Sequence, residues 1–193
     1  MTQDVQELAK RIDACVFDAH GCLFPNTVWE GVMVDGKPFR PMVRHYSDGQ
    51  GLSMMRALGI RICIITSEKG EFASGIRSAL ERWNTLPSAR SGAWEPIELF
   101  EGCYGEAKLA ALQEWLAKNG KGLDTCGAMG DDLVDVAMLK AVAFPVAPAS
   151  AEEEIKKICR FTTDRAGGQG AVRDLANLLC RARGVDPFEL TIQ

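Results

Sequence analysis

The side chains best suited to chemistry follow the first apolar run of the chain. Residues 14–17 are apolar, and Asp18, Ala19, His20 and Gly21 come directly after them. A buried strand that delivers an aspartate into a glycine-containing turn is one way to present a nucleophile. An imidazole two residues later can exchange protons near neutral pH. Asp18 is therefore a candidate nucleophile, and His20 is a candidate general acid and base.

Polar residues also follow three later strand-like runs. They are Thr66 with Ser67, then Lys108, and then the acidic residues Asp131, Asp132 and Asp135. Ligands of open parallel sheets bind beyond the carboxyl ends of the strands, so we expect these groups to converge with Asp18. Each group alone has a simpler interpretation as a turn, a helix cap or solvated surface. Their order along consecutive strands favours one shared site.

Phosphoryl transfer is the chemistry that this set fits. It needs a nucleophile, a divalent cation, and donors around a highly charged phosphorus centre. Asp18 and Asp131 offer the hard oxygens that Mg²⁺ prefers. The Thr66 hydroxyl, the turn at Ser67 and the Lys108 ammonium can bind phosphate oxygens. In this hypothesis Asp18 attacks phosphorus.

Alternating apolar runs and amphipathic patterns predict a doubly wound α/β fold with a parallel sheet covered on both faces. The expected strands are 14–18, 61–66, 97–99, 125–129 and 142–146. The expected helices are 51–58, 72–83, 106–118, 134–140, 151–157 and 171–183.

The length of 193 residues, with 47% apolar residues, predicts a single domain over 1–193. Two strand-like runs around Asp35-Gly36 predict a β-hairpin flap over about 27–45. Residues 83–96 are expected to form an irregular surface insertion, and residues 184–193 a C-terminal tail.

Composition excludes several classes of partner. The net charge is −4 and no basic cluster exceeds Lys156-Lys157, which argues against nucleic acid or an anionic membrane as partner. No apolar stretch of membrane-spanning length and no signal-peptide pattern is present, so a cytoplasmic location is expected. The seven cysteines form no C-x-x-C pair, which favours reduced thiols over a zinc site.

The combined pattern resembles the haloacid dehalogenase superfamily of aspartyl phosphatases. It consists of Asp18–Gly21, Ile64–Thr66, Lys108 and Gly130–Asp135. Within that superfamily the chain is similar to the capless branch of 3-deoxy-D-manno-octulosonate 8-phosphate phosphatases and related nonulosonate 9-phosphate phosphatases. Three further stretches resemble that branch: residues 48–51, 100–102 and 167–173. The resemblance covers about residues 12–183.

This resemblance implies a Mg²⁺-dependent phosphatase that acts on a phosphorylated 2-keto-3-deoxy sugar acid through a phosphoaspartyl intermediate at Asp18. Thr66 and Lys108 would hold the phosphate, while Asp131 and the backbone carbonyl of His20 would join Asp18 around the metal. The branch also implies a homotetramer, in which the glycine-rich segment before Arg173 lies near a neighbouring pocket.

Substrate contacts are suggested by residues near the second strand. Ser67-Glu68-Lys69 is similar to the Gly-Glu-Lys of nonulosonate phosphatases. Glu68 could accept hydrogen bonds from sugar hydroxyls, and Lys69 could pair with a carboxylate. An exposed helix start is the alternative for both residues. Further candidates are Arg77, Arg44 and His45.

His20 departs from the resemblance, because the branch normally has a second aspartate at this position. Imidazole can replace a carboxylate in proton transfer, so an active phosphatase is expected. A catalytically weakened assembly or regulatory module in sugar-acid activation is the alternative. Transfer of the phosphoryl group to an acceptor other than water is a third possibility.

Overall fold

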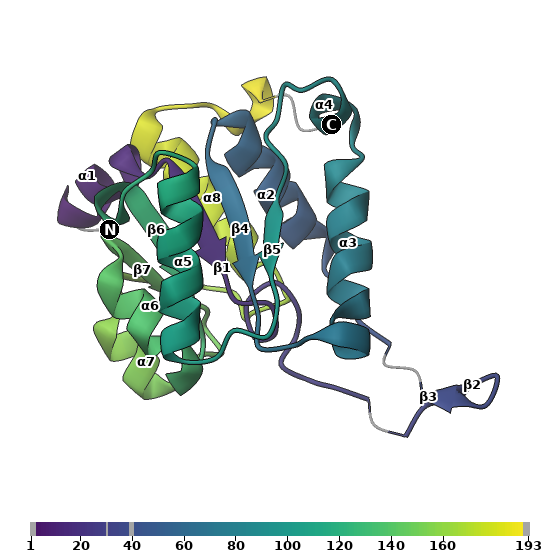
Figure 1. Cartoon of the computed structure of the whole chain (residues 1–193). Coiled ribbons are helices and arrows are strands. Elements are labelled where there is room, and N and C mark those ends of the chain that lie inside the picture. The colour runs from purple at the N-terminus through teal and green to yellow at the C-terminus, as the bar shows by residue number, and fades with distance from the viewer. Residues whose placement is uncertain (1–2, 30, 39–40, 191–193) are drawn as a thin grey trace.

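The computed structural model describes residues 3–29, 31–38 and 41–190, and its centre is a parallel β-sheet (Figure 1). In the described part of the chain the sheet has six strands in the order β5-β4-β1-β6-β7-β8. They are β1 (Ala14–Phe17), β4 (Arg61–Ile65), β5 (Glu98–Phe100), β6 (Cys126–Met129), β7 (Phe144–Ala147) and β8 (Phe161–Thr162). Every paired strand is parallel to its neighbour, and β1 lies between β4 and β6.

Helices cover both faces of this sheet (Figure 1). One layer contains α1 (Gln3–Arg11), α2 (Tyr46–Ala57), α3 (Ser74–Asn84) and α8 (Ala171–Arg183). The other contains α5 (Glu106–Lys118), α6 (Val136–Ala141) and α7 (Glu153–Ile158). All four β1 residues are buried, and successive side chains enter opposite cores, as the two-residue period of a strand requires. The doubly wound fold predicted from the sequence is confirmed.

The described part of the chain after β1 contains a hairpin within the predicted flap over 27–45. Its ladder pairs β2 (Met33–Val34) with β3 (Lys37–Pro38) in antiparallel register. Asp35 and Gly36 form the turn with φ of 50° and 72°, the left-handed values that a tight hairpin turn needs. Figure 1 shows this hairpin projecting from the end of the molecule where the β4 arrow points. Residues 27–29 and 41–45 belong to neither strand.

The segment predicted as an irregular surface insertion at 83–96 is instead anchored to the body. Helix α3 continues to Asn84, and α4 (Pro87–Arg90) follows. The side chains of Trp83 and Trp94 are buried. The Arg56 guanidinium donates to the carbonyls of Trp83 and Glu95 and lies 5.1 Å from the centre of the Trp94 ring. A buried cation that satisfies backbone carbonyls holds this excursion in place.

Other element boundaries also differ from the prediction. Helix α2 begins at Tyr46 rather than at residue 51, because the His45 side chain accepts the N–H of Ser47 and caps it. Helix α1 and the two-residue strand β8 were not predicted. Single turns of 3₁₀ helix are η1 (Gly70–Ala73), η2 (Leu123–Thr125), η3 (Leu133–Asp135) and η4 (Pro187–Glu189). The last lies in the expected tail, whose residues 191–193 are outside the described residues.

Candidate active site

The strand ends meet at one edge of the sheet. The backbone hydrogen bonds of the sheet continue one residue past β1 and β4. The Asp18 N–H donates to the Met129 carbonyl, and the Thr66 N–H donates to the Phe100 carbonyl. Gly130, which precedes Asp131, donates in the same way to Val146. The sheet backbone therefore fixes the positions from which the Asp18, Thr66 and Asp131 side chains start.

A buried lysine joins two of the acidic residues. Lys108 Nζ lies 2.5 Å from Asp18 Oδ1 and 2.6 Å from Asp135 Oδ1, and its side chain is completely buried. One carboxylate oxygen from each of Asp18, Asp131 and Asp135 lies within 4.8 Å of the other two. Three carboxylates against one ammonium leave an excess of negative charge in a buried space. Hard oxygen donors of this kind fit Mg²⁺.

Asp135 organises the loop after β6. Its Oδ2 accepts the N–H of Asp131 at 3.0 Å and of Asp132 at 3.4 Å, while its Oδ1 accepts from Lys108. Asp132 is exposed and caps the turn η3 through the N–H of Leu133. Among the predicted acidic residues, Asp135 is thus part of the buried cluster, and Asp132 has the simpler role of a cap.

The Asp131 carboxylate is held by groups that follow β1. A Cβ atom on Gly21, whose φ is 86°, would lie 2.0 Å from Asp131 Oδ2. Asn26 Nδ2 donates to the same oxygen at 3.2 Å. Asn26 carries no signal in the sequence, because a lone asparagine in a loop is typical of any turn. Only the fold brings it to Asp131.

Burial shifts the titration of this cluster. Desolvation, with neighbouring carboxylates, raises the pKa of Asp18 to about 7 despite the opposing effect of Lys108. Desolvation and the charges of Asp135 and Asp132 raise the pKa of Asp131 to about 7. Burial alone would lower the pKa of Lys108, but the Asp18 and Asp135 carboxylates outweigh it and raise that pKa. The lysine stays charged, and the raised pKa values let Asp18 and Asp131 retain protons near neutral pH without a cation.

Thr66 and Ser67 lie at the end of β4, next to β1. Thr66 is buried, and its Oγ1 accepts the N–H of Glu68 at 3.2 Å. The hydroxyl can still donate its own hydrogen to an anion. Ser67 is exposed. The turn after β4 can thus offer a hydroxyl donor beside the strand that ends in Asp18.

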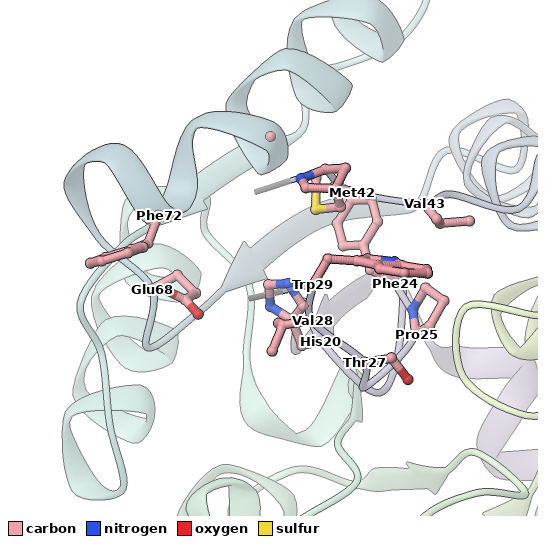
Figure 2. A pocket seen from close by; sticks show the side chains of 12 residues that line it. His20, Phe24, Pro25, Thr27, Val28, Trp29, Met42, Val43, Glu68 and Phe72 are labelled. Carbon is pink, nitrogen blue, oxygen red and sulfur yellow. The ribbon is translucent and has the colours of Figure 1, made fainter. Parts of the chain in front are cut away.

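His20 lies at the wall of a cavity of about 210 Å³. Its ring centre is 6.1 Å from that of Phe24. Figure 2 shows the imidazole facing the same space as Trp29 and Met42, with Glu68 and Phe72 on the other side. Of the two substrate candidates after β4, Glu68 lines this cavity, whereas Lys69 is exposed and does not line it.

Arg173 and Arg77 are engaged within the chain. Arg173 donates to Gln50 Oε1 and Asn177 Oδ1, both at 3.0 Å, and is absent from the lining of the His20 cavity. Arg77 pairs with Glu101 at 2.6 Å. The structure therefore does not bring either arginine together with the acidic cluster.

Arg44 and His45 are also placed by local contacts. The Arg44 guanidinium carbon lies 4.9 Å from the centre of the Tyr46 ring. The Arg44 side chain also lines a second cavity, of about 360 Å³, beside α3. His45 caps α2. These contacts explain both side chains without a substrate.

The glycine-rich segment 167–170 packs against the loop that follows β1 in the same chain. A Cβ on Gly167 would lie 1.6 Å from the Gly21 carbonyl oxygen, and the Gly168 N–H donates to the Cys22 carbonyl at 2.8 Å. Buried Asp48 accepts the N–H groups of Gly170 and Val172, both at 2.9 Å. This close approach explains why glycine is needed here.

Comparison with known proteins agrees with this arrangement. Residues 56–174 match the haloacid dehalogenase-like hydrolase family. The 3-deoxy-D-manno-octulosonate 8-phosphate phosphatase of Escherichia coli K12 is 27% identical over 184 residues, covering 95% of this chain and 87% of that protein. A probable YrbI-family phosphatase structure from Pseudomonas syringae is 30% identical with a TM-score of 0.74, covering 95% and 93% of the two chains.

A further structure shows the same fold. It is the 3-deoxy-D-manno-octulosonate 8-phosphate phosphatase of Moraxella catarrhalis, in complex with magnesium, phosphate and KDO. It is 22% identical, with a TM-score of 0.77, and the match covers 95% of this chain and 94% of that one.

The parallel sheet, covered by helices on both faces, makes this chain a doubly wound α/β protein. The chain belongs to the haloacid dehalogenase-like hydrolase family. Within that family its similarity, over nearly its whole length, is to the 3-deoxy-D-manno-octulosonate 8-phosphate phosphatase branch. In the described part of the chain no helix is long and apolar enough to cross a membrane.

Proposed function

We propose that this protein is a Mg²⁺-dependent phosphatase that hydrolyses a phosphorylated 2-keto-3-deoxy sugar acid of the octulosonate 8-phosphate or nonulosonate 9-phosphate type. The observation that carries the proposal is the buried cluster in which Lys108 joins Asp18 and Asp135, with Asp131 within 4.8 Å. A scaffold has no need to bury three carboxylates and an ammonium, because such groups are costly to desolvate.

Asp18, Asp131 and the His20 carbonyl would hold Mg²⁺, with Asp135 orienting the loop that carries Asp131. When bound, the ion neutralises charge on the phosphate and on the carboxylates. The donor set fits such an ion, because the cluster offers several hard oxygens and only one internal cation.

The chemistry proceeds in two steps. An Asp18 oxygen bonds to phosphorus as the bond to the sugar-acid oxygen breaks, and that oxygen takes a proton and leaves as the alcohol. Water then attacks phosphorus, releases inorganic phosphate and restores Asp18. Lys108 and the Thr66 hydroxyl bind phosphate oxygens in both steps, and the turn at Ser67 lies beside them.

His20 is the group that we assign to the proton transfers. It follows Asp18 by two residues and lines the cavity that the leaving alcohol would occupy. Imidazole can donate the proton to the departing oxygen and then accept one from the attacking water. Glu68, in the same wall, is in position to contact the sugar-acid portion.

The alternative function is a weakened module that binds phosphate compounds without rapid turnover. His20 is the observation that favours it, because it replaces a carboxylate by a base of different charge and shape. Phosphate release from octulosonate 8-phosphate and nonulosonate 9-phosphate, measured with Mg²⁺ for wild type and Asp18→Asn, separates the two functions. We expect release by wild type and none by Asp18→Asn; equal release by both proteins, or by neither, would contradict the phosphatase.

A further inference from the structure

A buried carboxylate that the proposed mechanism does not use lies in the first turn of α2. The Asp48 side chain belongs to a residue that is 1% exposed, and its two oxygens accept backbone N–H groups at the start of α8. Oδ2 accepts from Gly170 and Oδ1 accepts from Val172, both at 2.9 Å. Gly170 is the N-cap residue of α8 and has no side chain with which to cap that helix. A carboxylate from a different helix therefore satisfies these N–H groups and opposes the dipole of α8 favourably.

The residues just before α8 lie against the loop that follows β1. A Cβ atom on Gly167 would lie 1.6 Å from the carbonyl oxygen of Gly21, and the Gly168 N–H donates to the Cys22 carbonyl at 2.8 Å. A Cβ atom on Gly168 would lie 2.2 Å from the backbone nitrogen of Pro25. Backbone meets backbone here with no side chain between them. Because so close a contact has no slack, a shift of the glycine-rich segment moves the loop.

The same loop carries groups that we assign to the metal and to proton transfer. His20 immediately precedes Gly21. A Cβ atom on Gly21 would lie 2.0 Å from Oδ2 of Asp131, so the loop backbone packs directly against that carboxylate. Contacts therefore run from Asp48, through the glycine-rich segment, to the loop that carries His20.

We infer that Asp48 is a positioning residue for the proposed phosphatase, which holds the His20 loop at the metal site through residues 167–170. The inference rests on the proposed function and deepens it, since Asp48 acts through the loop and not on the substrate. If either oxygen is lost, a buried N–H group is left without an acceptor, and the start of α8 must shift to satisfy it. A misplacement of about 1 Å at reacting groups can cost about 100-fold in rate, so a residue outside the site can control the reaction.

Asp48→Asn tests the inference with little change in side-chain shape. The amide keeps one acceptor oxygen and replaces the other with an NH₂ group, so one of the two N–H groups loses its acceptor. We expect kcat to fall and the Kd for Mg²⁺ to rise, each by about 10-fold, the lower end of what supporting residues contribute at metal sites. The KM for the sugar-acid phosphate at saturating Mg²⁺ should change little, because Asp48 does not contact the substrate in this hypothesis. Wild-type kcat and Mg²⁺ affinity in Asp48→Asn would overturn the inference.

Arg56→Met is the matched control for loss of a buried charge. Arg56 lies in the same helix and is 4% exposed, but its guanidinium satisfies the carbonyls of Trp83 and Glu95. Its loss should lower the unfolding midpoint, as loss of the Asp48 carboxylate does, and leave kcat and Mg²⁺ affinity unchanged. Equal losses of kcat and of Mg²⁺ affinity in the two variants would show that Asp48 only stabilises the fold.

Gly167→Ala breaks the same chain of contacts at its other end. The added methyl group meets the Gly21 carbonyl, while both hydrogen bonds of Asp48 can remain. We expect weaker Mg²⁺ binding in this variant as well. Addition of Asp48→Asn to it should then weaken binding little further, because both changes act through one segment. Losses of affinity that simply add in the double variant would contradict a shared route.

NMR of the histidine side chains reports on the loop without turnover. The chain has two histidines, His20 and His45, and the His20→Asn variant assigns their signals. The His20 ring centre lies 6.1 Å from that of Phe24, so its signals respond to small movements of the loop. In metal-free protein we expect the His20 signals to shift in Asp48→Asn and to stay in place in Arg56→Met.

This readout separates failure of the positioning role from failure of the phosphatase. Shifted His20 signals and weaker Mg²⁺ binding in Asp48→Asn, combined with no phosphate release by wild type, would keep the positioning role and remove the phosphatase. Unmoved signals and unchanged Mg²⁺ affinity in that variant, combined with phosphate release by wild type, would remove the positioning role alone.

Discussion

The Lys108 ammonium lies 2.5 Å from Oδ1 of Asp18, although the two residues are 90 positions apart in the sequence. Asp18 follows the central strand β1, whereas Lys108 lies in the first turn of α5. The lysine side chain is completely buried, so water cannot replace it as a partner of the carboxylates. This ion pair therefore links packing of α5 to the charge of the candidate nucleophile.

Substitution of this lysine should affect both folding and catalysis. Lys108→Met leaves Asp18 and Asp135 without their cation, and removal of one partner from a buried pair costs about 3–5 kcal/mol of stability. Protonation of the two carboxylates in the variant would recover part of the lost stability. We expect phosphatase activity to be lost, even under conditions where circular dichroism shows a folded variant.

Lys118→Met is the control. The Lys118 side chain is 65% exposed, so its ion pair with Glu98 should contribute at most about 1 kcal/mol to stability. Similar unfolding midpoints for the two variants would contradict this account.

Substitution of His20 by aspartate should increase turnover. The carboxylate restores the acid and base group that the branch normally has at this position, and a positioned general catalyst contributes about 10²–10⁴ in rate. His20→Asn keeps a polar side chain of similar size but cannot exchange protons, so it should be slower than wild type. Steady-state kcat for the three proteins decides the matter. A His20→Asp enzyme no faster than wild type would show that imidazole has its own adapted role.

Binding of Mg²⁺ should strengthen as pH rises. In the metal-free protein the pKa values of Asp18 and Asp131 are raised to about 7, so both carboxylates are largely protonated at pH 6 and ionised at pH 8. A cation must displace those protons, which weakens its apparent affinity at pH 6 by about 10-fold for each carboxylate. Titration calorimetry at both pH values measures this difference. Asp131→Asn should show a smaller pH dependence, and a pH-independent affinity in wild type would refute the prediction.

The same raised pKa values have a consequence for the metal-free protein. The folded state holds these protons more tightly than the unfolded chain, whose aspartates titrate near 3.8. The stabilising contribution is therefore full below that value and is lost as pH rises through about 7. Thermal unfolding with and without Mg²⁺ should show that the ion stabilises the protein more at pH 8 than at pH 6.

The flap should take part in self-association. We propose a homo-oligomer, a tetramer by resemblance to the branch, in which the hairpin contacts a neighbouring copy. Met33 is 57% exposed and Val34 is 49% exposed at the tip of the hairpin. Met33→Asp should shift the mass measured by light scattering toward the monomer, whereas Leu133→Asp, at an exposed position in η3 outside the hairpin, should not. A wild-type monomer would remove the proposal.

The order of strand ends could be read from the sequence because parallel topology places consecutive carboxyl ends at one edge. Apolar runs predicted β1, β4 and β6, and the residues after them indicated Asp18, Thr66 and Asp131. The two-residue strand β8 was missed because so short a strand depends on tertiary packing more than on its own pattern. The anchoring of residues 83–96 was missed for a related reason. An arginine such as Arg56 is usually a surface cation, and only the fold brings it to the Trp83 and Glu95 carbonyls that it holds.

The contact between Asn26 and Asp131 gives the last prediction. Asn26 Nδ2 donates to Asp131 Oδ2 at 3.2 Å from a loop that precedes the flap, so it restrains the carboxylate that we assign to Mg²⁺. Asn26→Ala should weaken Mg²⁺ binding several-fold, corresponding to a net hydrogen-bond contribution of about 1 kcal/mol. Thr27→Ala is the control, because Thr27 is exposed in the same loop.

Activity should recover at saturating Mg²⁺ in Asn26→Ala, since the residue acts through Asp131 and not on the substrate. A lower kcat that excess Mg²⁺ does not restore would show that Asn26 has a different role.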